Sequence, residues 1–192
     1  MYIFCERLNN KSFAGVVVNY FQIFGFAAQF ELDVRKLAEL YQTLQKKVHP
    51  DKFAHASSQD QLVAVKKSTL INDAYQTLKN PLKRAQYLLT LRESDQPNEQ
   101  ASFSDNSFLM RQMELHEMLD DVKHADDHEA AISSYAEVLN AGSQELMSKM
   151  HKLLDDNTIQ SNLLAGDNLR KLKFYQKLRV DLDKLEDQLF DD

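Results

Sequence analysis

The 192-residue chain has little of what stapled or turn-rich proteins need. Its single cysteine, Cys5, excludes an internal disulfide framework and a zinc cluster built from cysteines. Four glycines and three prolines leave few positions for the tight turns of a sheet protein. Leucine, glutamine, lysine, glutamate and aspartate are abundant instead, and most of these favour helices. We therefore expect an all-helical protein.

The chain also lacks a long apolar run. No segment approaches the ~18 uninterrupted apolar residues of a membrane span. The apolar stretch at 13–30 is interrupted by Asn19 and Gln22 and shows no small-residue cleavage pattern, so we do not expect a secretory signal. A hydrophobic content of 43% supplies a packed core and excludes global disorder. The expected location is the reducing cytoplasm, with no membrane partner.

Charge is distributed unevenly along the chain. Residues 33–92 hold eleven Lys or Arg and five Asp or Glu, a net charge of +6. Residues 93–192 hold ten Lys or Arg and twenty-two Asp or Glu, a net charge of −12. Segments of opposite sign indicate two surfaces for two different partners.

The first half of the chain shows three amphipathic helical patterns after a short apolar segment of about two turns at 20–26. Asp33 is an expected N-cap, and Pro50 must end the helix that follows it. A second helix starts near Ser58, and Asn80-Pro81 opens a third that reaches Leu91. The apolar positions of the first two helices are Val34, Leu37, Tyr41, Leu44 and Val48, and then Leu62, Val65, Ile71, Tyr75 and Leu78.

The second half predicts a separate helical unit. Residues 93–104 are polar, contain Pro97 and are typical of a linker. Helical stretches follow at roughly 106–124, 127–154 and 158–190. Short connections and one-sided apolar stripes favour an antiparallel three-helix bundle.

The tripeptide His49-Pro50-Asp51 stands between the first two amphipathic helices. Proline forces the chain to turn there, so a histidine and an aspartate project at a helix–helix corner. Arg35, Lys36, Lys46 and Lys47 point away from the apolar stripe of the preceding helix, at ~100° per residue. A simple helix stop with solubilising lysines, or a nucleic-acid-binding face without interleaved aromatics, would show the same features.

The helix predicted at 106–124 has two apolar faces, and a three-helix bundle can bury only one of them. Phe108, Leu115, Leu119 and Val122 form the larger face, which we expect to be the core. Leu109, Met110 and Met113 are then left exposed beside three carboxylates, an arrangement typical of a protein-binding site. The alternative is that the linker or the first half of the chain covers this second face.

Signatures of enzymes and metal sites are weak. His124 and His128 are spaced as metal ligands, with Asp126 and Asp127 between them, but no third ligand follows and a solvated turn with a cap is favoured. His49 and Asp51 have no nucleophile or oxyanion-forming loop beside them. No phosphate-binding GxxxxGK[ST] motif occurs. We expect no catalytic residues, no metal and no cofactor.

These motifs together resemble a known family. HPDKF between two helices, followed by Asn80-Pro81 and a short helix, is similar to a J-domain. Four further segments make the resemblance specific to the HscB family, J-domain co-chaperones of iron–sulfur cluster assembly. They are YFQIFG from Tyr20, NPLKRAQYLL from Asn80, FLMRQMEL from Phe108 and RKLKF from Arg170. The expected organisation is an extension at 1–18, a J-domain at 19–92, a linker at 93–104 and a three-helix client-binding domain at 105–192, in an L-shaped molecule. The extension does not fit the family, and we hypothesise that it is a mis-called start, with Val18 as the initiator.

The resemblance implies a co-chaperone that stimulates the ATPase of an HscA-type chaperone and delivers the scaffold protein IscU to it. A J-protein adaptor that delivers another client to a DnaK-type chaperone is the alternative. The resemblance to the HscB family implies chaperone contacts through His49, Pro50, Asp51, Arg35, Lys46 and Lys47. It implies scaffold contacts through Leu109, Met110, Met113, Glu114, Glu117, Asp121 and Phe174. Arg111 stands where the family leads us to expect an acid, and Met113 where we expect leucine.

Overall fold

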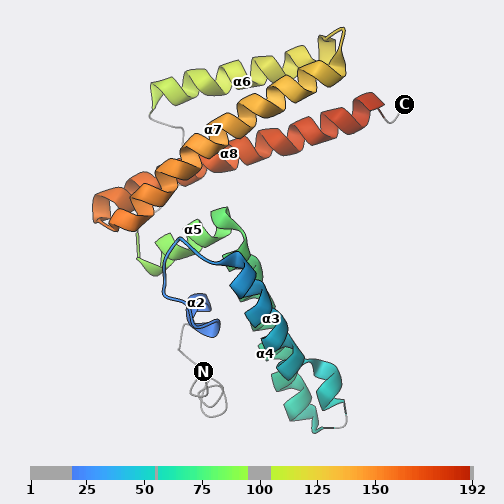
Figure 1. The fold of residues 1–192 in the computed structure, drawn as a ribbon, viewed down its shortest axis with the longest axis vertical. Helices are drawn as coiled ribbons and strands as arrows, with labels where there is room; N and C mark the ends of the chain where they lie inside the picture. Colours follow the sequence, from blue (N-terminus) through green and yellow to red (C-terminus); the bar gives the residue numbers. More distant parts are fainter. Residues whose placement is uncertain (1–18, 55, 95–104, 191–192) are drawn as a thin grey trace. The chain divides into compact units, whose positions relative to one another are not determined.

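The computed structural model describes residues 19–54, 56–94 and 105–190, which form helices joined by short connections with no strand among them (Figure 1). They divide into two compact units, one within Met1–Leu91 and the other within Arg92–Asp192. The predicted extension at 1–18, with Cys5, and most of the predicted linker at 93–104 lie outside the described residues. The all-helical fold class is confirmed for the described part of the chain.

Unit 1 is built on a helical hairpin. Its elements are α2 (Tyr20–Ile23), α3 (Val34–Val48), the 3₁₀ helix η1 (Pro50–Phe53), α4 (Ser58–Lys79) and α5 (Pro81–Leu91). Helices α3 and α4 lie side by side, with η1 at the turn between them (Figure 1). Both predicted caps are confirmed. The Asp33 carboxylate accepts two backbone hydrogen bonds of 3.0 Å at the start of α3, and the Asn80 side chain accepts two at the start of α5.

The core of unit 1 corrects two expectations. Helix α2 has one turn rather than two, and Gly25 follows it at φ +71°, a left-handed conformation that favours glycine. Leu62 and Val65 of α4 are 54% and 47% exposed and Val34 of α3 is 39% exposed, so these predicted apolar positions do not join the core. At ~100° per residue Leu62 lies opposite the buried Ile71, and one helix face cannot hold both.

One cation of unit 1 is structural. The Arg84 side chain is buried, donates from Nε to the Phe30 carbonyl at 2.8 Å and also hydrogen-bonds the Leu78 carbonyl. Its guanidinium lies 5.1 Å from the centroid of the Phe30 ring. Burial lowers the pKa of Arg84. Arg84 therefore ties α5 to the end of α4 and to the segment before α3, and it adds little to the cationic surface.

Unit 2 is a three-helix bundle of α6 (Asn106–His124), α7 (His128–Asp156) and α8 (Ile159–Phe190), close to the predicted ranges. Helices α7 and α8 pack along much of their length, and α6 packs on α7 (Figure 1). The buried Tyr135 of α7 donates from its hydroxyl to the Leu115 carbonyl of α6 at 2.9 Å. Burial raises the pKa of Tyr135 to about 12, so it remains a hydrogen-bond donor at physiological pH.

Candidate protein-binding surfaces

His49 and Asp51 of the His-Pro-Asp corner are exposed and are joined by a local hydrogen bond. Helix α3 ends at Val48 and η1 begins at Pro50, so His49 stands between them. The Nδ1 atom of His49 accepts the backbone N–H of Asp51 at 3.3 Å and lies 3.4 Å from the Asp51 carboxylate. The two side chains are 53% and 88% exposed. An imidazole and a carboxylate are thus presented to solvent on a short turn.

The predicted cations of α3 are all exposed, but they spread over two flanks of the helix. Lys46 lines a groove of about 590 Å³ between α3 and α4, together with His49. The ammonium of Lys36 instead lies 5.9 Å from the centroid of the Phe26 ring. At ~100° per residue Arg35 shares the flank of Lys46, and Lys47 shares that of Lys36. A partner that covers the groove would meet Lys46 before Lys47.

The groove beside the corner is lined mainly by polar residues, and no pattern in the sequence indicates it. Tyr41 donates from its hydroxyl to the Asn72 side chain at 3.3 Å. Gln45 and Ser68 exchange two hydrogen bonds, of 2.8 and 3.1 Å. Both pairs join α3 to α4, and their interhelical geometry fixes the groove that Lys46 and His49 border. Hydrogen bonds between two helices cannot be predicted from the apolar period of either helix alone.

The second surface is the exposed face of α6. Phe108, Leu115 and Val122 are buried, while Met110 and Met113 are each 65% exposed. Glu114, Glu117 and Asp121 are exposed beside the methionines. The predicted choice between the two apolar faces is therefore confirmed within the described residues. Two positions are corrected: Leu119 is only half-buried, and so is Leu109, because both stand at the flanks of the buried stripe.

Helix α8 brings Phe174 to the side of α6. The Phe174 ring is half-buried and packs edge-on against Phe108, with ring centroids 5.7 Å apart. It also lies 5.6 Å from the ring of His116, an exposed residue that the apolar pattern of α6 did not predict to belong to this surface. Nδ1 of His116 donates to the Gln112 carbonyl at 2.7 Å, because a carbonyl can only accept. The signal was available, since His116 is three residues from Met113 and shares its side of α6.

Arg111 occupies the edge of this face. Its guanidinium forms a 2.9 Å ion pair with Glu114, one turn further along α6, and lies near Tyr175 of α8. These two partners raise the pKa of Arg111. Glu114, a predicted scaffold contact, is therefore already paired within the chain.

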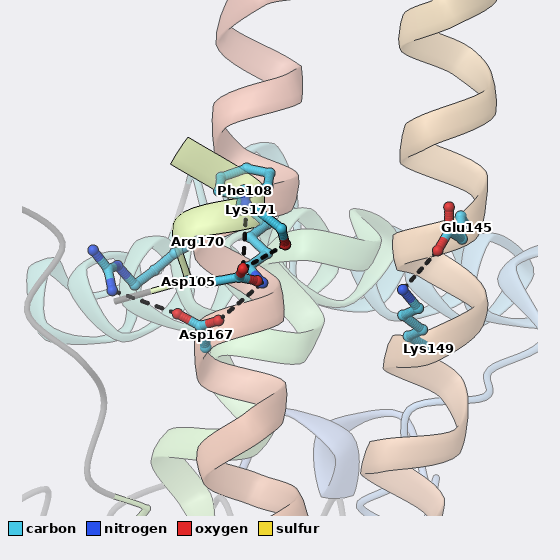
Figure 2. A network of polar contacts seen from close by, with 8 residues as sticks. Asp105, Phe108, Glu145, Lys149, Asp167, Arg170 and Lys171 are labelled. Atoms are coloured by element: carbon cyan, nitrogen blue, oxygen red, sulfur yellow. Dashed lines mark hydrogen bonds and ion pairs between the residues drawn. The ribbon is translucent and has the colours of Figure 1, made fainter. Parts of the chain in front are cut away.

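A polar network fixes the start of α6 against α8 (Figure 2). Lys171 Nζ lies 2.6 Å from the Asp105 carboxylate and 3.4 Å from that of Asp167. Asp105 also caps α6, accepting the Phe108 N–H at 3.2 Å. Hydrogen bonds from Lys171, Ser107 and the Phe108 backbone hold the pKa of Asp105 well below its usual range. The network thus sets the register of Phe108 against Phe174, beneath the exposed methionine face.

Comparison with known proteins places both units in one family. A family model described as the DnaJ domain matches residues 19–87, and a model described as the HSCB C-terminal oligomerisation domain matches residues 104–183. The "Co-chaperone protein HscB homolog" of Colwellia psychrerythraea is 57% identical over 175 residues, which are 91% of this chain and 100% of that relative. The chain belongs to the HscB family of co-chaperones. The HscB homolog of Aeromonas salmonicida is 46% identical over 91% of this chain and 99% of that relative.

Solved HscB structures show the same fold. The chain is similar to the chaperone HscB from Vibrio cholerae, with a TM-score of 0.79 and 42% identity over 90% of this chain and 100% of that one. It is also similar to the human co-chaperone protein HscB, with a TM-score of 0.81 and 29% identity over 90% of this chain and 84% of that one. Unit 1 is therefore the J-domain of an HscB protein, which implies an Hsp70-type chaperone as partner.

The remaining candidate site, the histidines and aspartates at 124–128, lies at the turn between α6 and α7. His128 Nδ1 donates to the Val122 carbonyl at 3.0 Å near the end of α6, and Asp127 caps α7 by accepting the Ala130 N–H. His124 is exposed. Among the described residues no group of three or more His, Cys, Asp or Glu side chains is placed to hold a metal ion. In the same part of the chain no helix is long and apolar enough to cross a membrane.

Proposed function

We propose that this co-chaperone stimulates the ATPase of an HscA-type chaperone and delivers the iron–sulfur scaffold IscU to it, in support of the maturation of iron–sulfur proteins. The observation that carries the proposal is the 57% identity to an HscB co-chaperone over that relative's whole length. Two exposed surfaces of different chemistry, one in each unit, support it. The proposed site of action is the cytoplasm.

The chaperone surface is proposed to centre on His49, Pro50 and Asp51, with Arg35, Lys46 and Lys47 as cationic support. Exposed ion pairs contribute little to affinity, but a cationic helix increases the rate of encounter with an acidic partner. The exposed carboxylate of Asp51 supplies the specific contact in this proposal, because the turn holds it beside His49.

The scaffold surface is proposed to be the exposed face of α6 with the adjacent Phe174. Its residues are Leu109, Met110, Met113, Glu114, Glu117, Asp121 and Phe174. Methionine side chains adapt to the shape of an apolar partner, and the flanking carboxylates select basic residues around it. The fitting partner is thus a small apolar surface with a basic rim.

The proposed mechanism uses binding alone and no catalytic residue of this chain. One surface captures the scaffold while the other engages the chaperone. The covalent connection between the units then makes delivery of the scaffold an intramolecular event at a raised effective concentration. Neither a cofactor nor nucleic acid takes part in this proposal.

The test is the ATPase rate of purified chaperones with and without this protein. HscA-type and DnaK-type chaperones are each assayed with and without IscU. Synergistic stimulation by this protein and IscU, confined to the HscA-type chaperone, is expected. Stimulation of the DnaK-type chaperone regardless of IscU would overturn the specialised function in favour of a general J-protein adaptor.

A further inference from the structure

Two apolar side chains of unit 1 are exposed where the sequence pattern would bury them. Leu62 and Val65, which we call the α4 apolar pair, are 54% and 47% exposed. They stand three residues apart in the first two turns of α4, on one side of the helix. That part of α4 packs next to η1, which carries the His-Pro-Asp corner.

The pair continues the wall of the groove between α3 and α4. At ~100° per residue Val65 is about 20° from Asn72, and Leu62 is about 20° from Thr69. Asn72 and Thr69 both line the groove, as do Lys46 and His49 on the opposite wall. An elongated ligand that contacts His49 and follows the groove therefore meets the α4 apolar pair.

The start of α4 is fixed rather than frayed. The Gln61 side-chain amide donates to the carbonyls of Ala54 and Ala56 at 3.1 and 3.2 Å. Ser57 caps the helix by accepting the Asp60 N–H. The pair is thus held at a defined place beside the corner, as a binding surface requires.

We propose that the α4 apolar pair is the apolar part of the chaperone-docking surface, and that an apolar segment of the Hsp70-type chaperone flanked by acidic residues occupies it. This inference rests on the proposed function. The charges favour that occupant, because Lys46 and Lys66 are exposed on either side of the pair and residues 33–92 carry a net charge of +6. A second J-domain at this position would bring like charges together.

The α4 apolar pair supplies a contribution to affinity that the exposed cations cannot supply. Exposed lysines steer an encounter, and salt screens their contribution to affinity. Leu62 and Val65 lose apolar surface to the partner, a gain that salt does not screen. The chaperone complex should therefore have one component that depends on salt and one that does not.

The experiment compares two matched serine substitutions in the full-length protein. L62S/V65S removes the pair, whereas V63S removes a neighbouring apolar side chain that is 40% exposed. Val63 lies about 160° from Val65, away from the groove. The readout is the concentration of co-chaperone that half-maximally stimulates the chaperone ATPase. We expect this concentration to rise about tenfold for L62S/V65S and less than about twofold for V63S.

Two further measurements complete the experiment: the salt dependence of each effect, and the activity of the D51N variant of the His-Pro-Asp corner. The L62S/V65S effect should persist at high salt, whereas that of Lys46→Ala should shrink. Unchanged stimulation by L62S/V65S, with D51N inactive, would overturn this inference and leave the proposed function standing. A wild-type protein that stimulates no Hsp70-type chaperone would overturn both. Wild-type self-association that L62S/V65S abolishes in sedimentation would assign the pair to a second copy and overturn the inference, and circular dichroism checks that each variant is folded.

Discussion

Arg111 and Glu114 form a 2.9 Å ion pair along the edge of the exposed face of α6. Their side chains are 39% and 56% exposed, so the pair contributes little to stability. Its main consequence is electrostatic, because a cation within the chain neutralises one carboxylate of the proposed scaffold surface. The family resemblance leads us to expect an acid at position 111, and the face therefore carries less negative charge than the resemblance implies.

Arg111→Ala should strengthen scaffold binding. The substitution frees the Glu114 carboxylate and makes the face more acidic, which favours a partner with a basic rim. We expect the dissociation constant for IscU to fall about threefold at low salt, and the gain to disappear at high salt. Titration calorimetry at two ionic strengths measures both effects.

Lys149→Ala is the matched control for that change. Lys149 forms a 2.6 Å ion pair with Glu145 along α7 rather than on the α6 face (Figure 2). Its removal should leave the affinity for IscU unchanged. Weaker binding of Arg111→Ala would show that Arg111 contacts the scaffold directly, contrary to our interpretation.

The two proposed surfaces should fail independently. Met110→Ala combined with Glu117→Ala truncates an exposed apolar anchor and one carboxylate of α6, and should weaken IscU binding at least about tenfold. Basal stimulation of the chaperone should be spared. Asp51→Asn should do the opposite, abolishing ATPase stimulation and sparing IscU binding.

The measurement is a pair of assays on the same protein preparations, one for IscU affinity and one for chaperone ATPase. Loss of both activities in Asp51→Asn would contradict the separation of roles between the units. Equal IscU affinity in the Met110/Glu117 variant would move the scaffold site away from α6.

Local signals explain why much of the fold was predictable. Asp33 and Asn80 cap helices through bonds to residues two and three positions ahead, so sequence spacing alone identifies them. The buried face of α6 was predictable for a similar reason, because Phe108, Leu115 and Val122 recur at a helical period over several turns.

Tertiary contacts explain why the sequence alone did not predict the surroundings of several side chains. Arg84 reads as one more surface cation until the Phe30 carbonyl, 54 residues away, is placed beside it. His116 shares the side of Met113 on α6, but the ring that packs on it, Phe174, comes from another helix. Leu62 and Val65 follow an apolar pattern, yet no neighbouring element covers their side of α4 among the described residues. In each case the decisive partner, or its absence, lies outside the local sequence.

Asp105 should make the stability of unit 2 depend on acid. Its pKa is lowered in the folded state, so its ionised form contributes stability above the unfolded pKa of about 4. That contribution is lost progressively as the pH falls below about 4. Asp105→Asn keeps a good N-cap but removes the charge that Lys171 binds. The melting temperature of this variant should be lower than wild type at pH 7, and the difference should narrow on acidification.

Glu145→Gln provides the comparison for Asp105→Asn. It removes an ion pair of the same 2.6 Å length, but one formed on the exposed side of α7 alone rather than between α6 and α8. Its effect on melting at pH 7 should be the smaller of the two. Equal effects would show that the Asp105–Lys171 contact does not tie the helices together.

Gly142→Ala should destabilise the protein, although alanine is the better helix former. A Cβ atom at position 142 of α7 would stand 2.5 Å from Cε1 and 2.6 Å from Oη of Tyr175 in α8. The gain in helix propensity is at most about 1 kcal/mol, whereas forcing a buried ring to move costs about 1–3 kcal/mol. We expect the free energy of unfolding, measured by urea titration, to fall by about 1–2 kcal/mol.

A double-mutant cycle identifies the cause of that loss. Gly142→Ala is repeated in a Tyr175→Leu background, where the ring is gone, and should there cost less or even stabilise. An equal loss in both backgrounds would show that the close approach to Tyr175 is not responsible. Because the Tyr175 ring lies near Arg111 and 6.0 Å from the Phe174 ring, its displacement should in addition disturb the α6 face and weaken IscU binding. Gly142 thus links the packing of α7 on α8 to the geometry of the proposed scaffold surface.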